Sequence, residues 1–292
     1  RHDRLHVPRI TDRTVAIIPV HLFGNPCDME SIMAIAAEND LAVIEDTSQA
    51  YGTMYHGRRC GTIGHIGSFS LQQSKHITTG DGGLTITDDD ELGERIRLFA
   101  NKGWPDYSAK GARDYTQFGF CYRMNELTAA VGLAQLRKLD RITTAYTWAG
   151  ELLTEKLQGI DGVTPPKTQP GGVHTYWLYA IRIDEDVLGM SAEKFAAAVT
   201  AEGASCGAGY IGRPIYMFEA LRSQHGIYGD TDFPFKSSEF GSGHSFEYEK
   251  GYCPEAERAL DEIVTLHVNQ WFTPQDIQDM ANIIHKVAAS RQ

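Results

Sequence analysis

The chain has 292 residues, of which 42% are hydrophobic, so it carries enough apolar side chain to fill one large or two ordinary domains. Its formal net charge of −11 argues against a surface for nucleic acid or for an anionic membrane, because such surfaces need clustered lysine and arginine. We therefore expect no nucleic-acid partner and no membrane partner, and a small molecule as the ligand.

The cysteines and histidines show no pattern of a metal site. The five cysteines are an odd number without C-x-x-C spacing, and the eleven histidines include no H-E-x-x-H motif. Neither a disulfide framework nor a zinc ribbon is indicated, so we predict a reduced, cytoplasmic protein without a bound metal. The sequence also has no apolar run near the roughly 20 residues that cross a bilayer.

The first half of the chain alternates strand and helix patterns. Short apolar runs typical of buried strands cover residues 15–20 and 41–45, and residues 67–71 and 84–87 indicate further strands. Asp28 caps a helical segment that reaches Asn39, and a second helical segment, which opens with acidic residues, covers residues 89–101. This βαβ order predicts an α/β domain.

The second half begins with a long amphipathic segment and a cluster of helix breakers. Apolar residues recur at helical spacing over residues 125–157, which predicts one long helix, broken near Thr143. Glycine and proline are frequent over residues 159–172, where neither a helix nor a central strand is tolerated. We therefore place a domain boundary there, between a large domain at residues 1–160 and a small one at 161–292.

The small domain is predicted to be α+β. Its pattern indicates one strand, two capped helices and a long loop without periodicity, which we expect near a site or an interface. The strand covers residues 175–183, the helices cover 191–202 and 274–289 with Thr273 as the second cap, and the loop covers 233–251.

Lys75 and Asp46 are the candidate catalytic residues. Asp46 ends an apolar strand, and Lys75 follows a later strand, roughly a βαβ unit further on. We therefore expect an amine and a carboxylate to line one pocket. That pair suits pyridoxal 5'-phosphate, because a lysine amine forms a Schiff base with its aldehyde and an aspartate beside the pyridine nitrogen keeps the ring protonated. Taken alone, each residue would more often be a solvated surface lysine or a helix cap.

Neighbouring residues strengthen this assignment. In an open α/β sheet, ligands bind beyond the carboxyl ends of the strands, where Asp46 and Gln49 are expected. Gln49 is placed to hydrogen-bond the ring oxygen of the cofactor. Ser70 is the better phosphate candidate of two nearby serines, and the glycine-rich turn over residues 78–83 lets the backbone approach an anion closely.

Five ordered motifs run through nearly the whole chain. They are residues 43–52 (VIEDTSQAYG), the Phe-Ser pair at 69–70 five residues before the lysine, 79–83 (TGDGG), 123–136 and 252–257 (YCPEAE). Together they resemble the DegT/DnrJ/StrS group of pyridoxal-phosphate aminotransferases, far more specifically than a single glycine pattern would.

The resemblance implies a fold-type-I enzyme, with a mainly parallel sheet in the large domain and a smaller α+β carboxy-terminal domain. Such enzymes transfer an amino group, usually from glutamate or glutamine, to a keto-sugar or keto-cyclitol. Two subunits build the active site, so a homodimer is implied. By the same resemblance, Asp46 binds the pyridinium and Lys75 carries the Schiff base. Gln49 contacts the ring face or O3′, and Ser70 contacts the phosphate.

Two features depart from the family pattern. Family members usually begin well before the position where this chain opens, with a glycine-threonine phosphate loop and an aromatic residue that stacks on the cofactor, so we expect that part to be missing here. Cys121 also stands where the family has an asparagine that reaches the neighbouring subunit's phosphate. A thiol is a weaker hydrogen-bond donor, so we expect weaker cofactor binding at Cys121.

Two alternatives stay open at the level of the sequence. A related dehydratase of the same family removes a sugar hydroxyl with the same cofactor, but that branch replaces the lysine with histidine, whereas here His76 follows Lys75. The other alternative is a non-catalytic binding or partner protein, because fold alone does not establish chemistry. His174 and Tyr176 resemble positions near the substrate in this family, yet a buried core histidine is at least as good an interpretation.

Overall fold

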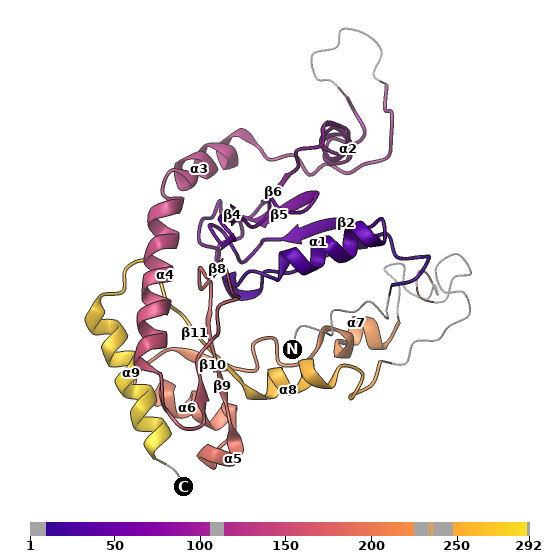
Figure 1. Cartoon of the computed structure of the whole chain (residues 1–292). Helices are drawn as coiled ribbons and strands as arrows, with labels where there is room; N and C mark the ends of the chain where they lie inside the picture. The colour runs from indigo at the N-terminus through magenta and orange to yellow at the C-terminus, as the bar shows by residue number, and fades with distance from the viewer. Residues whose placement is uncertain (1–9, 106–113, 225–232, 234, 236–247, 291–292) are drawn as a thin grey trace. The chain divides into compact units, whose positions relative to one another are not determined.

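The computed structural model describes residues 10–105, 114–224, 233, 235 and 248–290, in which the chain forms two compact units (Figure 1). Unit 1 comprises Arg1–Leu152, Lys167–Leu178 and Val268–Phe272. Unit 2 comprises Leu153–Pro166, Tyr179–His267 and Thr273–Gln292. The chain passes between the units several times, whereas the sequence predicts a single division at residue 160. The loop predicted over residues 233–251 lies almost entirely outside the described residues.

Unit 1 is built on a four-stranded sheet. Its strands in spatial order are β1 (Ala16–Ile17), β2 (Ala42–Asp46), β5 (Ile66–Ser70) and β6 (Gly83–Ile86). β1, β2 and β5 are parallel, and β6 runs antiparallel to β5. The strands predicted in the regions of β2, β5 and β6 are confirmed to within one residue at each end.

The apolar run at residues 15–20 departs from its prediction. Only Ala16–Ile17 form a strand, and Val15 and Ile18 expose 77% and 61% of their surface. β1 is an edge strand of the described sheet, with β2 as its only neighbouring strand there, so no further strand covers its other side. The predicted burial of this run is therefore wrong.

The first helix of unit 1 begins where its cap predicts. α1 (Met29–Glu38) starts after Asp28, whose carboxylate accepts a hydrogen bond from the amide of Ser31 at 3.2 Å. Its apolar face, which includes Met29, packs on Val43 of β2, and Figure 1 shows α1 running along this strand. The next helix, α2 (Asp90–Ala100), is capped in the same way by Asp89. Both predicted helices are confirmed.

The long helical segment consists of two helices, α3 (Glu126–Leu136) and α4 (Leu139–Lys156). The break falls between them and not at Thr143, which lies inside α4 and donates its hydroxyl to the carbonyl of Leu139 at 3.1 Å. A threonine can bond back to the preceding turn without ending a helix, which explains why the predicted position is wrong. All described residues of α3 lie outside the buried class, so this helix presents apolar side chains at its surface.

A small second sheet ties a distant segment into unit 1. Its strands in spatial order are β4 (Arg58–Arg59), β3 (Met54–Tyr55) and β8 (Gly172–Val173), and the 3-10 helix η2 (Leu22–Gly24) belongs to the same unit. β3 pairs antiparallel with β8. Residues that follow the predicted domain boundary are thereby brought back to the first half of the chain.

Unit 2 is an antiparallel sheet with helices packed on it. Its strands in spatial order are β10 (Cys206–Ala208), β11 (Ile263–Leu266), β9 (Tyr179–Ile183) and β7 (Val163–Thr164). Its helices are α5 (Glu185–Leu188), α6 (Ala192–Ala201), η3 (Ile215–Met217), α7 (Glu219–Arg222), α8 (Pro254–Glu262) and α9 (Pro274–Ala289). α6 contacts both β10 and α9, and it buries Phe195 and Val199.

Both helices predicted for the second domain are confirmed with their caps. Ser191 accepts a bond from the amide of Lys194 before α6, and Thr273 forms a capping box with Asp276 before α9. The strand predicted over residues 175–183 begins only at Tyr179, because Tyr176 has a left-handed φ of 45°. In the part of the chain that the structure describes, none of the helices combines the length and apolar character needed to cross a membrane.

Candidate active site

Asp46 lies at the carboxyl end of β2, between β1 and β5. Its amide donates to the carbonyl of Pro19 at 2.8 Å, and the residue pairs in register with Ser68 of β5. Its Oδ1 accepts a hydrogen bond from the amide of Ser48 at 3.0 Å. Asp46 is only partly buried, so its carboxylate stands at the edge where open sheets bind ligands.

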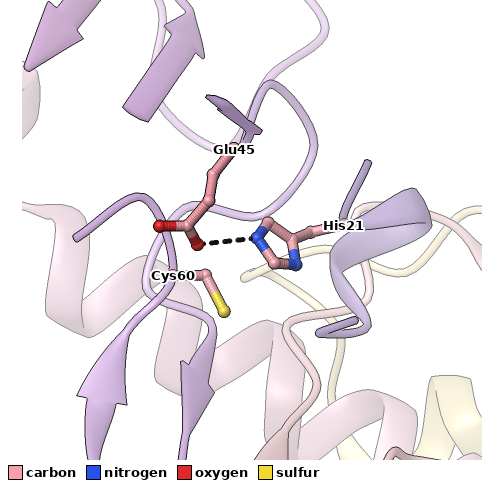
Figure 2. A group of neighbouring side chains, drawn as sticks. All are labelled: His21, Glu45 and Cys60. Carbon is pink, nitrogen blue, oxygen red and sulfur yellow. Dashed lines mark hydrogen bonds and ion pairs between the residues drawn. The ribbon is translucent and has the colours of Figure 1, made fainter. Parts of the chain in front are cut away.

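The neighbouring carboxylate of Glu45 is held inside the protein (Figure 2). Successive side chains of a strand point to opposite faces, so Glu45 and Asp46 diverge. Glu45 is fully buried, and a hydrogen bond of 3.0 Å joins its Oε2 to Nε2 of His21. Backbone amides also donate to the carboxylate, at 2.7 Å from Gly61, 2.7 Å from Ile63 and 2.6 Å from Gly64.

The second contact of His21 fixes its tautomer. Nδ1 accepts a hydrogen bond from the amide of Cys27 at 3.0 Å, so Nε2 carries the proton that is donated to Glu45. Burial acts to raise the pKa of Glu45, but the bonds from His21 and the backbone amides outweigh it and lower the pKa below its ordinary 4.5. Glu45 is therefore a buried carboxylate ion that ties the loop after β4 to the strand ending in Asp46.

The side chains of His21, Glu45 and Cys60 resemble a metal site, because their ligand atoms lie within 4.8 Å of one another (Figure 2). The hydrogen bonds argue against that function. Each oxygen of Glu45 already accepts two bonds, and both ring nitrogens of His21 are engaged. Burial, assisted by Glu45, raises the pKa of the Cys60 thiol, whereas a metal ligand must be a thiolate. We call His21, Glu45 and residues 61–64 the Glu45 anchor.

Lys75 lies in a tight turn after β5. Its amide donates to the carbonyl of Gln72 at 3.0 Å, and the amide of Thr79 donates to the carbonyl of Leu71 at 3.0 Å. Leu71 and Ile77, on either side of Lys75 in the sequence, are each 1% exposed and hold the turn in the core. We call residues 71–79 the lysine turn. The side chain of Lys75 is partly exposed, although Leu71 and Ile77 of the same turn are buried.

The Lys75 amine and the Asp46 carboxylate lie within electrostatic reach of each other. Burial lowers the pKa of Lys75, and the negative charge of Asp46 acts in the opposite direction with a smaller effect. A lowered pKa increases the fraction of neutral amine, which is the form that attacks an aldehyde. The structure thus brings together the two residues that the sequence singles out for catalysis.

Trp177 also contacts Lys75, and no local sequence pattern predicts it. Nζ of Lys75 lies 4.0 Å from the centre of the indole ring, and the indole N–H donates to the carbonyl of Ser74 at 2.7 Å. Ser74 and Trp177 are 103 positions apart, and the path of the chain after β8 brings them together. The one available signal is that Trp177 follows Tyr176, a position that resembles a substrate-facing one.

Gln49 and Ser70 lie on the segments that carry the two catalytic candidates. Oε1 of Gln49 accepts a hydrogen bond from the amide of Phe23 at 2.9 Å. Oγ of Ser70, at the end of β5, accepts one from the amide of Gln72 at 3.2 Å. Gln49 follows β2 and Ser70 precedes the lysine turn, so both fall near the carboxyl ends of adjacent parallel strands.

Cys121 lies elsewhere in unit 1. It is exposed, and its backbone forms an isolated antiparallel bridge with Asn101, the residue after α2. The other four candidates are on β2, β5 and the segments directly after these strands. A contact of Cys121 with the phosphate of a neighbouring subunit stays a prediction.

His174 and Tyr176 are core residues. They are 4% and 2% exposed, and their rings stack with centroids 3.7 Å apart. Nε2 of His174 lies 3.2 Å from the carbonyl oxygen of Phe23, and burial lowers the pKa of His174 to about 4. These observations favour the buried core interpretation of His174 over a substrate-facing one.

Comparison with known proteins gives a family match over most of the chain. The sequence model of the DegT/DnrJ/EryC1/StrS aminotransferase family matches residues 7–237. The chain is 32% identical over 293 residues to the L-glutamine:2-deoxy-scyllo-inosose aminotransferase of Micromonospora echinospora, covering 97% of this chain and 67% of the relative. It is 38% identical over 177 residues to the GDP-perosamine synthase of Caulobacter vibrioides, covering 60% and 47%. Matches to these relatives thus span from about half to about two thirds of their length.

Solved structures match over almost the whole chain. The aminotransferase from Psychrobacter cryohalolentis gives a TM-score of 0.80 at 26% identity, covering 97% of this chain and 70% of that one. DesV of S. venezuelae, solved in complex with a ketimine intermediate, gives a TM-score of 0.80 at 25% identity, covering 96% and 67%. These likenesses confirm the fold class predicted from the sequence, that of the pyridoxal-phosphate-dependent transferases of fold type I.

Proposed function

This chain belongs to the DegT/DnrJ/EryC1/StrS aminotransferase family, and from that premise we propose that it is a pyridoxal-phosphate-dependent aminotransferase that moves an amino group from glutamate or glutamine to a keto-sugar or keto-cyclitol. The names of two relatives support these substrate classes, since one names L-glutamine and an inosose and the other names GDP-perosamine. The homodimer implied by the family, with a site shared between subunits, is part of the proposal.

A single observation carries the proposal. An amine whose pKa is lowered by burial lies within electrostatic reach of a carboxylate at the carboxyl edge of the sheet. Pyridoxal phosphate needs a nucleophilic amine for its aldehyde, an anion for its ring nitrogen and hydrogen-bond donors for its phosphate. Lys75, Asp46 and Ser70 offer these groups, and a φ of 133° at Gly82 marks a backbone conformation that favours glycine in the adjoining turn. The donor set therefore fits this cofactor.

The two catalytic candidates have separate tasks in this proposal. When bound, the cofactor supplies the electron sink for the reaction. Lys75 would hold the aldehyde group through Nζ, and the same Nζ would serve as the base that takes the proton from the α-carbon of the amino donor. Asp46 holds the protonated ring nitrogen by a charge-assisted hydrogen bond.

The side-chain oxygens of Gln49 and Ser70 both accept hydrogen bonds from backbone amides. The side-chain oxygen of Gln49 accepts a hydrogen bond from the amide of Phe23, so the group that we assign to the ring oxygen of the cofactor is the NH₂ of Gln49. The oxygen of Ser70 accepts the amide of Gln72, so its own O–H is directed at another acceptor, which we assign to the phosphate. Both residues therefore act as donors toward an anionic or oxygen-bearing ligand.

The dehydratase alternative gains no support at His76. This residue is 5% exposed, and its Nε2 lies 2.9 Å from the carbonyl oxygen of Thr175. Burial lowers the pKa of His76 to about 4, so the ring is neutral and held in the core. Lys75, in contrast, is partly exposed, and transamination is the function that this geometry supports best.

Reductive trapping tests the proposal. The protein is mixed with pyridoxal phosphate, reduced with borohydride and digested, and the modified lysine is identified by mass spectrometry. We expect the added mass on Lys75. Lys102 is the internal control, because its Nζ also lies near an indole ring, 5.7 Å from that of Trp104, but it belongs to none of the family motifs. Equal modification of Lys75 and Lys102 would refute the assignment, and a failure to bind any cofactor would favour the binding-protein alternative.

A further inference from the structure

Trp177 contacts the lysine turn through both parts of its side chain. Nζ of Lys75 lies 4.0 Å from the centre of the indole ring, and the indole N–H donates to the carbonyl of Ser74, the residue before the lysine, at 2.7 Å. An ammonium over an aromatic face is attracted by the electron density of the ring. One side chain therefore holds both the charged end of the lysine and the backbone from which it extends.

The segment that carries Trp177 is itself held by several contacts. The carbonyl of Thr175 lies 2.9 Å from Nε2 of His76, which gives the segment a second hydrogen bond to the lysine turn. Tyr176 packs so closely on Gly150 of α4 that a Cβ at this glycine would lie 2.4 Å from the ring. Tyr176 also has a φ of 45°, a conformation that persists only where surrounding contacts impose it. The position of the indole ring is thus set by the core of unit 1.

We propose that Trp177 is the positioning residue of the Lys75 amine: its ring holds the resting ammonium in one place, and its N–H holds the turn, so that the amine meets an aldehyde-bearing ligand from a fixed direction. This inference rests on the proposed function, because only a reacting lysine needs a fixed direction of approach. To react, Nζ loses one proton to solvent and leaves the ring, since the contact stabilises only the charged form. Its lone pair would then bond to the carbonyl carbon as the bonds from that carbon to oxygen break, and the oxygen would leave as water with the two remaining protons of the amine.

Several neighbouring groups influence the protonation state of the Lys75 amine. Burial favours the neutral amine, whereas Asp46 at the end of β2 and the ring of Trp177 favour the ammonium. His76, the next residue, is neutral at physiological pH because burial lowers its pKa to about 4. Removing the ring is therefore expected to lower the pKa of Lys75, and removing only the N–H is expected to loosen the turn.

Two substitutions separate these roles. Trp177→Phe keeps an aromatic face but loses the N–H, and Trp177→Leu loses both. Competitive acylation of the lysines over a range of pH, read by mass spectrometry, gives the pKa and reactivity of Lys75 without any cofactor. We expect Trp177→Leu to raise the neutral fraction of this amine at a fixed pH about two- to fivefold, and Trp177→Phe to change it less than about twofold.

Amide hydrogen exchange of residues 74–79 measures the second role. Both variants lose the bond to Ser74, so we expect exchange of this peptide to become about fivefold faster in each. Trp271→Leu is the matched control, because Trp271 belongs to unit 1 and exposes 72% of its surface. It is expected to leave both readouts unchanged.

The outcomes separate this inference from the proposed function. Wild-type acylation and wild-type exchange in Trp177→Leu would overturn the positioning role. If Trp177→Leu does not fold, Trp177→Phe decides, because unchanged exchange in that variant would equally overturn it. A third outcome is also distinguishable. If the Trp177 variants show the expected changes in acylation and exchange, but reductive trapping attaches no cofactor to Lys75, the positioning of the amine is supported and the proposed function is overturned.

Discussion

Two neighbouring carboxylates at the end of β2 have opposite surroundings. Glu45 is fully buried in the Glu45 anchor, where both of its oxygens accept hydrogen bonds from His21 and backbone amides. Asp46 belongs to what we call the Lys75 site, formed by Asp46, Lys75 and Trp177, where it is partly buried near an amine. We infer that the first carboxylate holds the strand end in place and that the second takes part in chemistry.

The difference follows from how many lone pairs of each carboxylate are in use. A carboxylate whose lone pairs all accept hydrogen bonds has no capacity left for a ligand, and its buried charge is stable only while those donors stay in place. A partly solvated carboxylate with one backbone bond keeps that capacity. On this inference, one strand end contributes to stability on one face and would bind the ligand on the other.

Lys75→Ala is expected to have the largest effect on function. The change removes the amine that, in the proposed function, attaches the cofactor and acts as a base, so the rate of amino transfer is expected to fall by about 10²- to 10⁴-fold or more. Since the side chain is partly exposed, the free energy of unfolding is expected to change by less than about 0.5 kcal/mol. Amino transfer from glutamine to a keto-cyclitol, followed by mass, measures the rate. Full transfer by this variant would remove Lys75 from the mechanism.

Glu45→Gln and Asp46→Asn compare the two carboxylates directly. In Glu45→Gln an NH₂ group replaces an oxygen that accepts N–H donors, so we expect a loss of about 3–5 kcal/mol in the free energy of unfolding. Asp46→Asn keeps an oxygen for the amide of Ser48, and we expect a loss of less than about 1 kcal/mol. Urea unfolding of both variants gives these values.

Cofactor binding by the same two variants provides the converse test. Asp46→Asn is expected to weaken the retention of pyridoxal phosphate although the protein stays folded, because the anion opposite the ring nitrogen is lost. If Asp46→Asn proves the less stable protein and binds cofactor normally, the division of tasks between the two carboxylates is wrong.

Acidification is expected to destabilise the protein through His76 and His174. Burial lowers the pKa of each from 6.5 to about 4, so the unfolded chain binds protons below pH 6.5 that the folded protein does not. The stability contributed by the neutral rings is therefore present above pH 6.5 and is lost as the pH falls toward 4. At pH 5 the expected loss relative to pH 7 is about 2 kcal/mol per histidine.

Chemical unfolding at a series of pH values checks this dependence. His76→Gln removes one of the two titrating groups and is expected to make the loss about half as steep between pH 6.5 and 5. Glu45 contributes in a lower range, because its lowered pKa preserves its contribution until the pH falls below the ordinary value of 4.5. A flat stability profile between pH 7 and 5 would mean that the two histidines are not neutral core residues.

Features that depend on near neighbours in the chain were predictable from the sequence. The caps Asp28 and Thr273 receive hydrogen bonds from amides three residues further on, so a short pattern contains all the information. Lys75 and Asp46 could be singled out for the same reason, because each lies in a short motif beside the end of a predictable strand. Their catalytic roles stay predictions.

Features that depend on distant segments could not be predicted in this way. Glu45 depends on His21, 24 positions earlier, and on amides of a loop after β4, and nothing in its strand pattern indicates these partners. Trp177 reaches the lysine turn only because β8 pairs with β3. The exposure of Val15 has the same kind of cause, because the position of a strand within a sheet depends on other segments and cannot be predicted from the residues of that strand.

Asp140→Asn is expected to have the smallest effect. Asp140 pairs with Arg59 at 3.1 Å, but the two side chains are 81% and 52% exposed, so water solvates both charges and salt screens their attraction. The expected loss in the free energy of unfolding is less than about 0.5 kcal/mol, and it should shrink further at high salt. Urea unfolding in parallel with Glu45→Gln measures the contrast. A loss at Asp140 as large as that at Glu45 would mean that the charge of a carboxylate matters more than its burial and saturated hydrogen bonds, and the comparison between the two faces of β2 would no longer hold.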